Sequence, residues 1–166
     1  MLPPRSAFAL VVATAELLLI GVNVQSILAS KGTNVVTVTD GVSLADAANM
    51  MRDNGIGALI VSDDGQHIDG IVSERDVVRA LANHGASALG RPVSSAMSTD
   101  VVTCRTGDAV ESLMLSMTER RIRHLPVVDN DGVLGGVISI GDVVKARLGQ
   151  LEAENQQLYE YITQGR

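Results

Sequence analysis

An internal duplication constrains this chain more than any other feature of its sequence. When residues 34–80 are placed over residues 100–146, a constant shift of 66 aligns them without a gap, and about a third of the positions are identical. The apolar run Val35-Val36-Thr37, for example, lies on Val101-Val102-Thr103. Because chance does not keep one register over so long a stretch, we interpret the chain as two copies of one unit of roughly 60 residues.

Each copy predicts the element order β-α-β-β-α. A β-rich apolar run and a glycine turn precede a helix whose apolar residues keep i, i+3, i+4, i+7 spacing, such as Leu44, Ala47, Ala48 and Met51. Two short strands follow, joined by turn-forming Asp, Asn and Gly residues. Since three strands and two helices are too few to bury a sheet face, we expect the two copies to pack sheet against sheet. The predicted strands are 35–38, 58–61 and 68–72 in the first copy, and 101–104, 125–128 and 134–138 in the second.

The junction between the last strand and the second helix carries the most specific motif. Gly70–Asp76 and Gly136–Asp142 both read Gly, two apolar residues, Ser, two residues, Asp, and this resembles the signature of the CBS domain. The resemblance covers residues 24–148, about three quarters of the chain. It implies an α/β (α+β) fold in which tandem β-α-β-β-α CBS repeats pack as a pseudo-twofold pair, often called a Bateman module.

The resemblance also divides the chain into segments. We expect an apolar extension over 1–23, CBS repeat 1 over 24–84, CBS repeat 2 over 91–148, and a C-terminal helix over 149–166.

Each Ser-x-x-Asp pair supports two interpretations. As a capping box, the serine caps the helix and the aspartate accepts from the serine amide. As a ligand site, the helix N-terminus seats a phosphate, the hydroxyl donates to it, and the carboxylate accepts from ribose hydroxyls. The resemblance implies the second use for Ser73, Asp76, Ser139 and Asp142, so that adenine nucleotides are the expected ligands.

Three cationic or titratable residues stand near these motifs. Arg75 follows Ser73 on the exposed start of a helix, where it can reach a phosphate, and Arg123 and His124 precede the middle strand of repeat 2. The alternative is that residues 120–124 form a solvated basic patch. Repeat 1 has no Arg-His pair and no proline in the corresponding segment Gly57–Val61, so a difference in phosphate affinity between the two clefts would originate there.

The base would meet a different set of residues. The resemblance implies that the first strands, at Thr37 and Thr103, receive adenine through backbone groups, with Ala58 and Ile122 as apolar walls. The alternative for both threonines is that they serve only as β-formers.

Composition excludes several function classes. A net charge of −6 and 2% aromatic residues argue against nucleic-acid binding, which needs cationic grooves and stacking surfaces. The three histidines lack metal-ligand spacing, and no catalytic motif is present, so we expect neither a metal site nor an enzyme. The single cysteine, Cys104, lies in an apolar run and suits a reducing compartment as a small buried residue.

The segment Ser6–Val24 is nearly all apolar and leaves three alternatives open. It is a start-site artefact, a packed N-terminal helix, or a membrane anchor or signal peptide; Glu16 near its centre argues against a membrane span.

The C-terminal segment carries the a/d pattern, or seam, of a short coiled coil, with residues that step by three and four positions: Leu148, Leu151, Asn155, Leu158 and Ile162. The seam favours self-association, with packing on the protein's own body as the alternative.

These features lead to one principal hypothesis and one alternative. The principal hypothesis is a non-enzymatic, cytoplasmic, homodimeric regulatory module that needs no cofactor. It binds AMP, ADP or ATP, with NAD(H) and S-adenosylmethionine as further candidates, and passes the occupancy to a protein partner. The alternative is a ligand-free interaction module that docks a partner through its acidic surface and C-terminal helix.

Overall fold

The computed structural model of the protein describes residues 21–164. The interpretations given above for residues 6–20 therefore lie outside the described residues. Within 21–164, no helix has both the length and the apolar content that crossing a bilayer requires.

The first repeat forms a three-stranded sheet in the order β1-β2-β3, with β1 parallel and β3 antiparallel to β2. Ser43 caps the first helix by accepting from the amide of Asp46, and Gly55 ends it in the left-handed conformation, at φ 64°. The elements are β1 (Thr37–Val38), α3 (Leu44–Asn54), β2 (Ala58–Val61), β3 (Gly70–Ser73) and α4 (Glu74–His84).

The second repeat keeps only its hairpin as a regular sheet. The strand predicted at residues 101–104 is reduced to a single bridge between Cys104 and Val127. In repeat 1 the amide of Ile60 donates to Val36, but the equivalent position in repeat 2 is Pro126, which has no N–H to donate. The elements are α5 (Val110–Arg120), β4 (His124–Val128), β5 (Leu134–Ser139) and α6 (Ile140–Gln164).

The segment that leads into the first predicted strand of each repeat packs into the core of the other repeat. Helix α2 (Val24–Lys31) places Val24, Ile27 and Leu28 in the apolar cluster of repeat 2. The short 3-10 helices η1 (Gly85–Gly90) and η2 (Val93–Ser95) contribute buried residues to the cluster of repeat 1. The two cores are therefore completed by reciprocal exchange, and neither repeat contains all of its own core.

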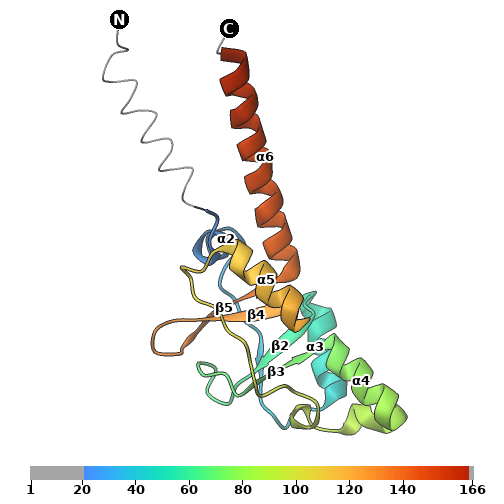
Figure 1. The fold of residues 1–166 in the computed structure, drawn as a ribbon. Coiled ribbons are helices and arrows are strands. Elements are labelled where there is room, and N and C mark those ends of the chain that lie inside the picture. The colour runs from blue at the N-terminus through green and yellow to red at the C-terminus, as the bar shows by residue number, and fades with distance from the viewer. Residues whose placement is uncertain (1–20, 165–166) are drawn as a thin grey trace, which may run out of the picture.

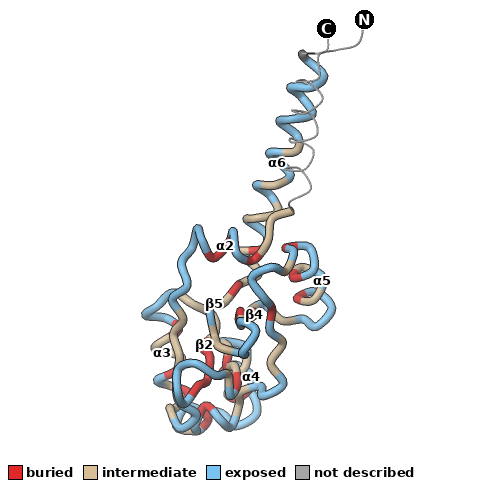
Figure 2. The backbone as a smooth tube through the Cα atoms, turned by 90° about the vertical axis from the view of Figure 1, so that its left-hand side faces the viewer, coloured by how far each residue is buried: buried red, intermediate tan, exposed pale blue. Residues whose placement is uncertain are grey.

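The two sheets lie next to each other in the middle of the molecule, with the helices outside. In Figure 1, α2, α5 and the start of α6 cover the β4–β5 hairpin, while α3 and α4 cover β2 and β3 on the opposite side. This is the mixed α/β fold of a CBS pair that the resemblance implied, with the long C-terminal helix that the a/d pattern of the tail predicted. The distal half of α6 projects from the body with its residues exposed (Figure 2).

Candidate functional site

Both Ser-x-x-Asp motifs form a hydrogen-bonded cap at the start of a helix. In α4, the amide and hydroxyl of Ser73 donate to Asp76 Oδ2 at 2.9 and 2.6 Å. In α6, the amide and hydroxyl of Ser139 donate to Asp142 Oδ2 at 2.8 and 2.7 Å. The capping interpretation of the motif is therefore correct, and both caps use the same carboxylate oxygen.

The second carboxylate oxygen stays available in each motif. Among the described residues, Oδ1 of Asp142 accepts no hydrogen bond, and Oδ1 of Asp76 has only Arg79 Nη1 at 3.8 Å. A carboxylate can hold the helix cap with one oxygen and accept from a ligand with the other. Capping and ligand binding are thus compatible in the same residue.

A cleft of ≈ 510 Å³ opens at the start of α6 and is called the Ser139 cleft below. Repeat 2 contributes Ser139, Asp142 and residues 123–124, while repeat 1 contributes the chain before β1 and residues 55–58. Its volume lies in the range of small-molecule sites, and its walls are largely apolar with a few polar groups. The apolar wall consists of Val35, Val36, Ile56, Ala58, Ile60, Val137 and Ile140.

Lys31, the last residue of α2, enters this cleft and binds Asp142. Its Nζ lies 2.6 Å from Asp142 Oδ2 and donates at 2.9 Å to the carbonyl of Val137. Burial alone would raise the pKa of Asp142, but the hydrogen bonds from Lys31 and Ser139 outweigh it and hold the pKa below its ordinary value. Asp142 therefore carries its negative charge at neutral pH.

His124 is the titratable group most affected by the site. It begins β4, pairs across the hairpin with Ser139, and lies so close to Gly57 that a Cβ there would be 3.2 Å from its Cε1. Burial lowers the pKa of His124, the neighbouring Arg123 lowers it further, and Glu74 acts in the opposite direction. Lys31 lowers the pKa and Asp142 raises it, and the net result is a pKa below the ordinary value, so the imidazole is mainly neutral at pH 7.

A second, smaller cleft of ≈ 330 Å³ opens at the start of α4 and is called the Ser73 cleft below. It is the counterpart of the first, since α4 of repeat 1 here faces residues 120–124 of repeat 2. The guanidinium of Arg75 donates from Nη1 to the carbonyl of Arg121 at 2.9 Å, which joins the two sides. Arg123 and His124 line both clefts and so lie between them.

The structure brings most of the residues expected from the sequence into these two clefts. Thr37 and Thr103 line neither of them, and the chain before β1 faces the Ser139 cleft instead, at residues 34–36. In the Ser139 cleft lie Ala58, Arg123, His124, Ser139 and Asp142; in the Ser73 cleft lie Ser73, Arg75, Asp76, Ile122, Arg123 and His124.

Sequence reasoning did not find several lining residues. Lys31 is 111 positions from Asp142 and belongs to no motif, so only the packing of α2 reveals it. Arg120 and Arg121 could have been assigned to the site from the charge difference between the two copies, whereas Arg79 aligns with Lys145 and shows no such difference.

Among residues 21–164, metal binding and thiol reactivity were the other candidate chemistries. No group of three or more His, Cys, Asp or Glu side chains there could hold a metal ion. Cys104 is buried, and burial together with the charge of Asp108 raises the pKa of its thiol to about 12. The thiol therefore stays protonated and packs as a small apolar residue.

Comparison with known proteins agrees with the fold, which is that of a protein built on a pair of CBS domains. The CBS domain family model matches residues 25–83 and 93–149. The chain belongs to the CBS-domain family.

Three relatives illustrate the similarity. A CBS-domain-containing protein of Agrobacterium tumefaciens is 46% identical with a TM-score of 0.73, over 75% of this chain and 92% of that one. The mitochondrial CBS domain-containing protein CBSX3 of Arabidopsis thaliana is 36% identical over 124 residues, covering 72% of this chain and 60% of the relative. A CBS domain protein of Pyrobaculum aerophilum, solved in complex with AMP, is 26% identical with a TM-score of 0.65, over 73% and 89% of the two chains.

Proposed function

We propose that this protein is a regulatory module that binds an adenine nucleotide in the clefts between its two CBS repeats and passes the occupancy to a partner. The observation that carries the proposal is the Ser139 cleft. There the available oxygen of Asp142, the hydroxyl of Ser139 and the cations Lys31 and Arg123 surround an apolar pocket. A ribose, a phosphate and a base each find a chemically matched group there.

The comparisons support the ligand class at a coarser level. The Pyrobaculum aerophilum relative was solved with AMP, and stand-alone proteins with a CBS pair are generally regulatory and not catalytic. We propose AMP, ADP or ATP as the ligand of this chain, with NAD(H) and S-adenosylmethionine as further candidates. No catalytic role, resident cofactor or metal is proposed.

Adenine nucleotides are expected to raise the melting temperature of the protein. A ligand that binds only the folded state adds about 2.7 kcal/mol of stability at a hundredfold excess over Kd. For a chain of this size that is roughly 5–10 °C in Tm. The measurement is a thermal-shift screen of AMP, ADP, ATP, NADH and S-adenosylmethionine, with GMP and GTP as controls that should shift Tm less. Absence of a shift at millimolar concentration would contradict nucleotide binding and favour the ligand-free interaction module.

Nucleotide affinity is expected to increase as the pH falls from 8 to 6.5. His124 is mainly neutral at pH 7 because its pKa lies below the ordinary value, and a bound phosphate would favour the imidazolium. Binding then takes up one proton, so that the affinity rises as the pH falls, by no more than about tenfold per pH unit. Calorimetric titration with AMP at several pH values measures the slope. The His124→Gln variant should flatten it, and an unchanged slope in that variant would show that another group titrates.

We also propose that α6 pairs with α6 of a second copy. The seam residues Leu148, Leu158 and Ile162 are 55%, 60% and 67% exposed in a single chain, in a helix that leaves the body of the protein. The a/d spacing makes this stripe complementary to itself, and the polar Asn155 at an inner position favours a two-stranded register. Burial of each apolar side chain stabilises a dimer by roughly 1.5–3 kcal/mol before the entropy of association is deducted.

Truncation after Gly149 is therefore expected to shift the protein toward the monomer in multi-angle light scattering. The point variant Leu158→Asp should act in the same direction, whereas Gln157→Asp, one position away and off the seam, should leave the mass unchanged. Nucleotide affinity should change little, because both Ser-x-x-Asp motifs lie upstream of the cut. If the truncated protein keeps the oligomeric state of the full-length protein, other surfaces form the dimer.

A further inference from the structure

The internal duplication allows the two clefts to be compared position by position. Each cleft is formed by the start of a helix from one repeat and the segment that precedes the middle strand of the other repeat. The shift of 66 residues therefore gives most lining residues of the Ser73 cleft a counterpart in the Ser139 cleft; the counterpart of Arg79 is Lys145, which lies outside that cleft. Differences between counterparts show how the chemistry of the two clefts differs.

The charge of the two clefts differs strongly. The segment facing α4 carries Arg120, Arg121, Arg123 and His124, where repeat 1 has an asparagine, two glycines and an alanine at residues 54, 55, 57 and 58. With Arg75 and Arg79 from α4, the Ser73 cleft holds five arginines against the single carboxylate of Asp76.

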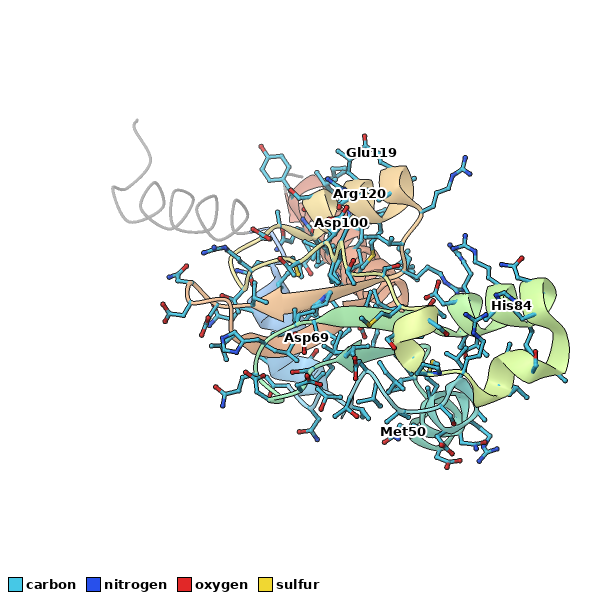
Figure 3. All side chains as sticks on the ribbon, turned by 90° about the horizontal axis from the view of Figure 1, so that it is seen from below. Met50, Asp69, His84, Asp100, Glu119 and Arg120 are labelled. Carbon is cyan, nitrogen blue, oxygen red and sulfur yellow. The ribbon has the colours of Figure 1, made fainter. Side chains whose placement is uncertain are left out.

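In the Ser139 cleft, by comparison, positive and negative side chains are equal in number. Lys31 and Arg123 are opposed there by Glu74 and Asp142. Figure 3 shows blue nitrogen atoms of side chains gathered between α5 and α4, near the labelled Arg120. The net charge is thus four positive in the Ser73 cleft and zero in the Ser139 cleft, with His124 neutral in both.

The backbone at Arg121 gives a second, independent observation. Arg121 is the only residue other than glycine with a positive φ among residues 21–164, at 55°, and its counterpart Gly55 has a φ of 64°. Glycine adopts this left-handed conformation without strain, whereas an arginine is strained there. Both residues are left-handed helix C-caps, Arg121 of α5 and Gly55 of α3, so repeat 2 has an arginine beside the Ser73 cleft at a position where the fold itself favours glycine.

Five guanidinium groups around one cleft favour a ligand that carries several negative charges. Guanidinium groups bind phosphate oxygens with paired hydrogen bonds, and a triphosphate supplies more charge and more acceptors than a monophosphate. We propose that the Ser73 cleft binds the polyphosphate chain of a nucleoside triphosphate, whereas the Ser139 cleft accepts a ligand with one phosphate or none. The assignment of a nucleoside rests on the proposed function above, while the preference for polyphosphate does not.

The test uses a variant that copies repeat 1 into repeat 2. Arg120→Asn/Arg121→Gly replaces two arginines by the residues at positions 54 and 55, and it removes the backbone strain, so its Tm should not fall. The bond from Arg75 goes to a backbone carbonyl and is retained. Isothermal titration of the full-length wild type and the variant with ATP, AMP and sodium tripolyphosphate, at 50 and 300 mM NaCl, measures the effect.

The expected result is a loss of about tenfold or more in affinity for ATP and for tripolyphosphate, with the affinity for AMP changed less than threefold. ATP binding by the wild type should weaken more between the two salt concentrations than AMP binding. The single variant Arg120→Asn should show a smaller loss of affinity for ATP and tripolyphosphate. It replaces the double variant in the test if the double variant does not fold.

The possible outcomes distinguish a failure of the polyphosphate preference from a failure of the proposed nucleotide function. If tripolyphosphate binds the wild type but no adenine compound does, the proposed nucleotide function fails and the polyphosphate preference stands. If the variant binds ATP and tripolyphosphate as tightly as the wild type, the polyphosphate preference is overturned while nucleotide binding stands. If neither ATP nor tripolyphosphate binds the wild type, the polyphosphate preference is likewise overturned.

Discussion

Replacement of both Ile27 and Leu28 by alanine is expected to lower the free energy of unfolding by about 4–10 kcal/mol, since each buried Ile or Leu to Ala change costs about 2–5 kcal/mol. Both side chains are buried in the core of repeat 2, although they precede the first strand of repeat 1. Leu28 packs so tightly that a Cβ at Gly136 of β5 would lie 2.8 Å from its Cδ2. The loss is comparable to the whole stability of an ordinary domain, about 5–15 kcal/mol.

Urea denaturation followed by circular dichroism measures this effect. The matched control is Gln25→Ala/Ser30→Ala, which changes two exposed positions of the same helix and should cost less than about 1 kcal/mol. Equal stability of the two double variants would show that α2 does not complete the second core in solution.

The Asp142→Asn variant is expected to weaken AMP binding by about 1.5–3 kcal/mol, the range for a hydrogen bond to a charged group, or roughly tenfold to 150-fold. The substitution keeps the size of the side chain and part of its capping ability. It removes the charge that pairs with Lys31 and that we propose accepts hydrogen bonds from the ribose. We expect stability to fall by less than about 1 kcal/mol, because the Asp142 carboxylate and Lys31 are partly exposed and their ion pair is screened by solvent.

Asp76→Asn tests the Ser73 cleft in the same way and serves as the matched comparison, because Asp76 has the same cap without a lysine. Isothermal titration and urea denaturation are run on both variants. If both lose stability and neither loses affinity, the two aspartates act only as helix caps.

Much of the fold followed from local patterns in the sequence. The helix of each repeat was predicted from apolar residues at i, i+3, i+4 and i+7, and both copies contain it, as α3 and α5. The hairpins followed from turn-forming residues between apolar runs, and both are present as β2–β3 and β4–β5. These elements could be predicted because the interactions that form them join residues close in the chain.

The strand expected at Val101–Cys104 shows where local propensity was insufficient. The run has the same β-forming composition as its counterpart in repeat 1, yet only Cys104 pairs. The difference lies in the partner strand, where Pro126 replaces a residue that donates a hydrogen bond. A strand forms only where a neighbouring strand can accept and donate its hydrogen bonds, and the residue that pairs with Cys104, Val127, lies 23 positions further along the chain.

The sequence by itself determined the duplication, the order of elements, the CBS family and the two Ser-x-x-Asp motifs, because each depends on residue types at fixed short spacings. Only the tertiary structure decided which segment completes which core, and that Lys31 meets Asp142 across 111 positions. It also decided that the segment around Arg121 faces α4 of the other repeat, which makes one cleft cationic. The physical reason is that these contacts join residues far apart in the chain, whose closeness depends on how whole elements pack and not on the chemistry of their neighbours.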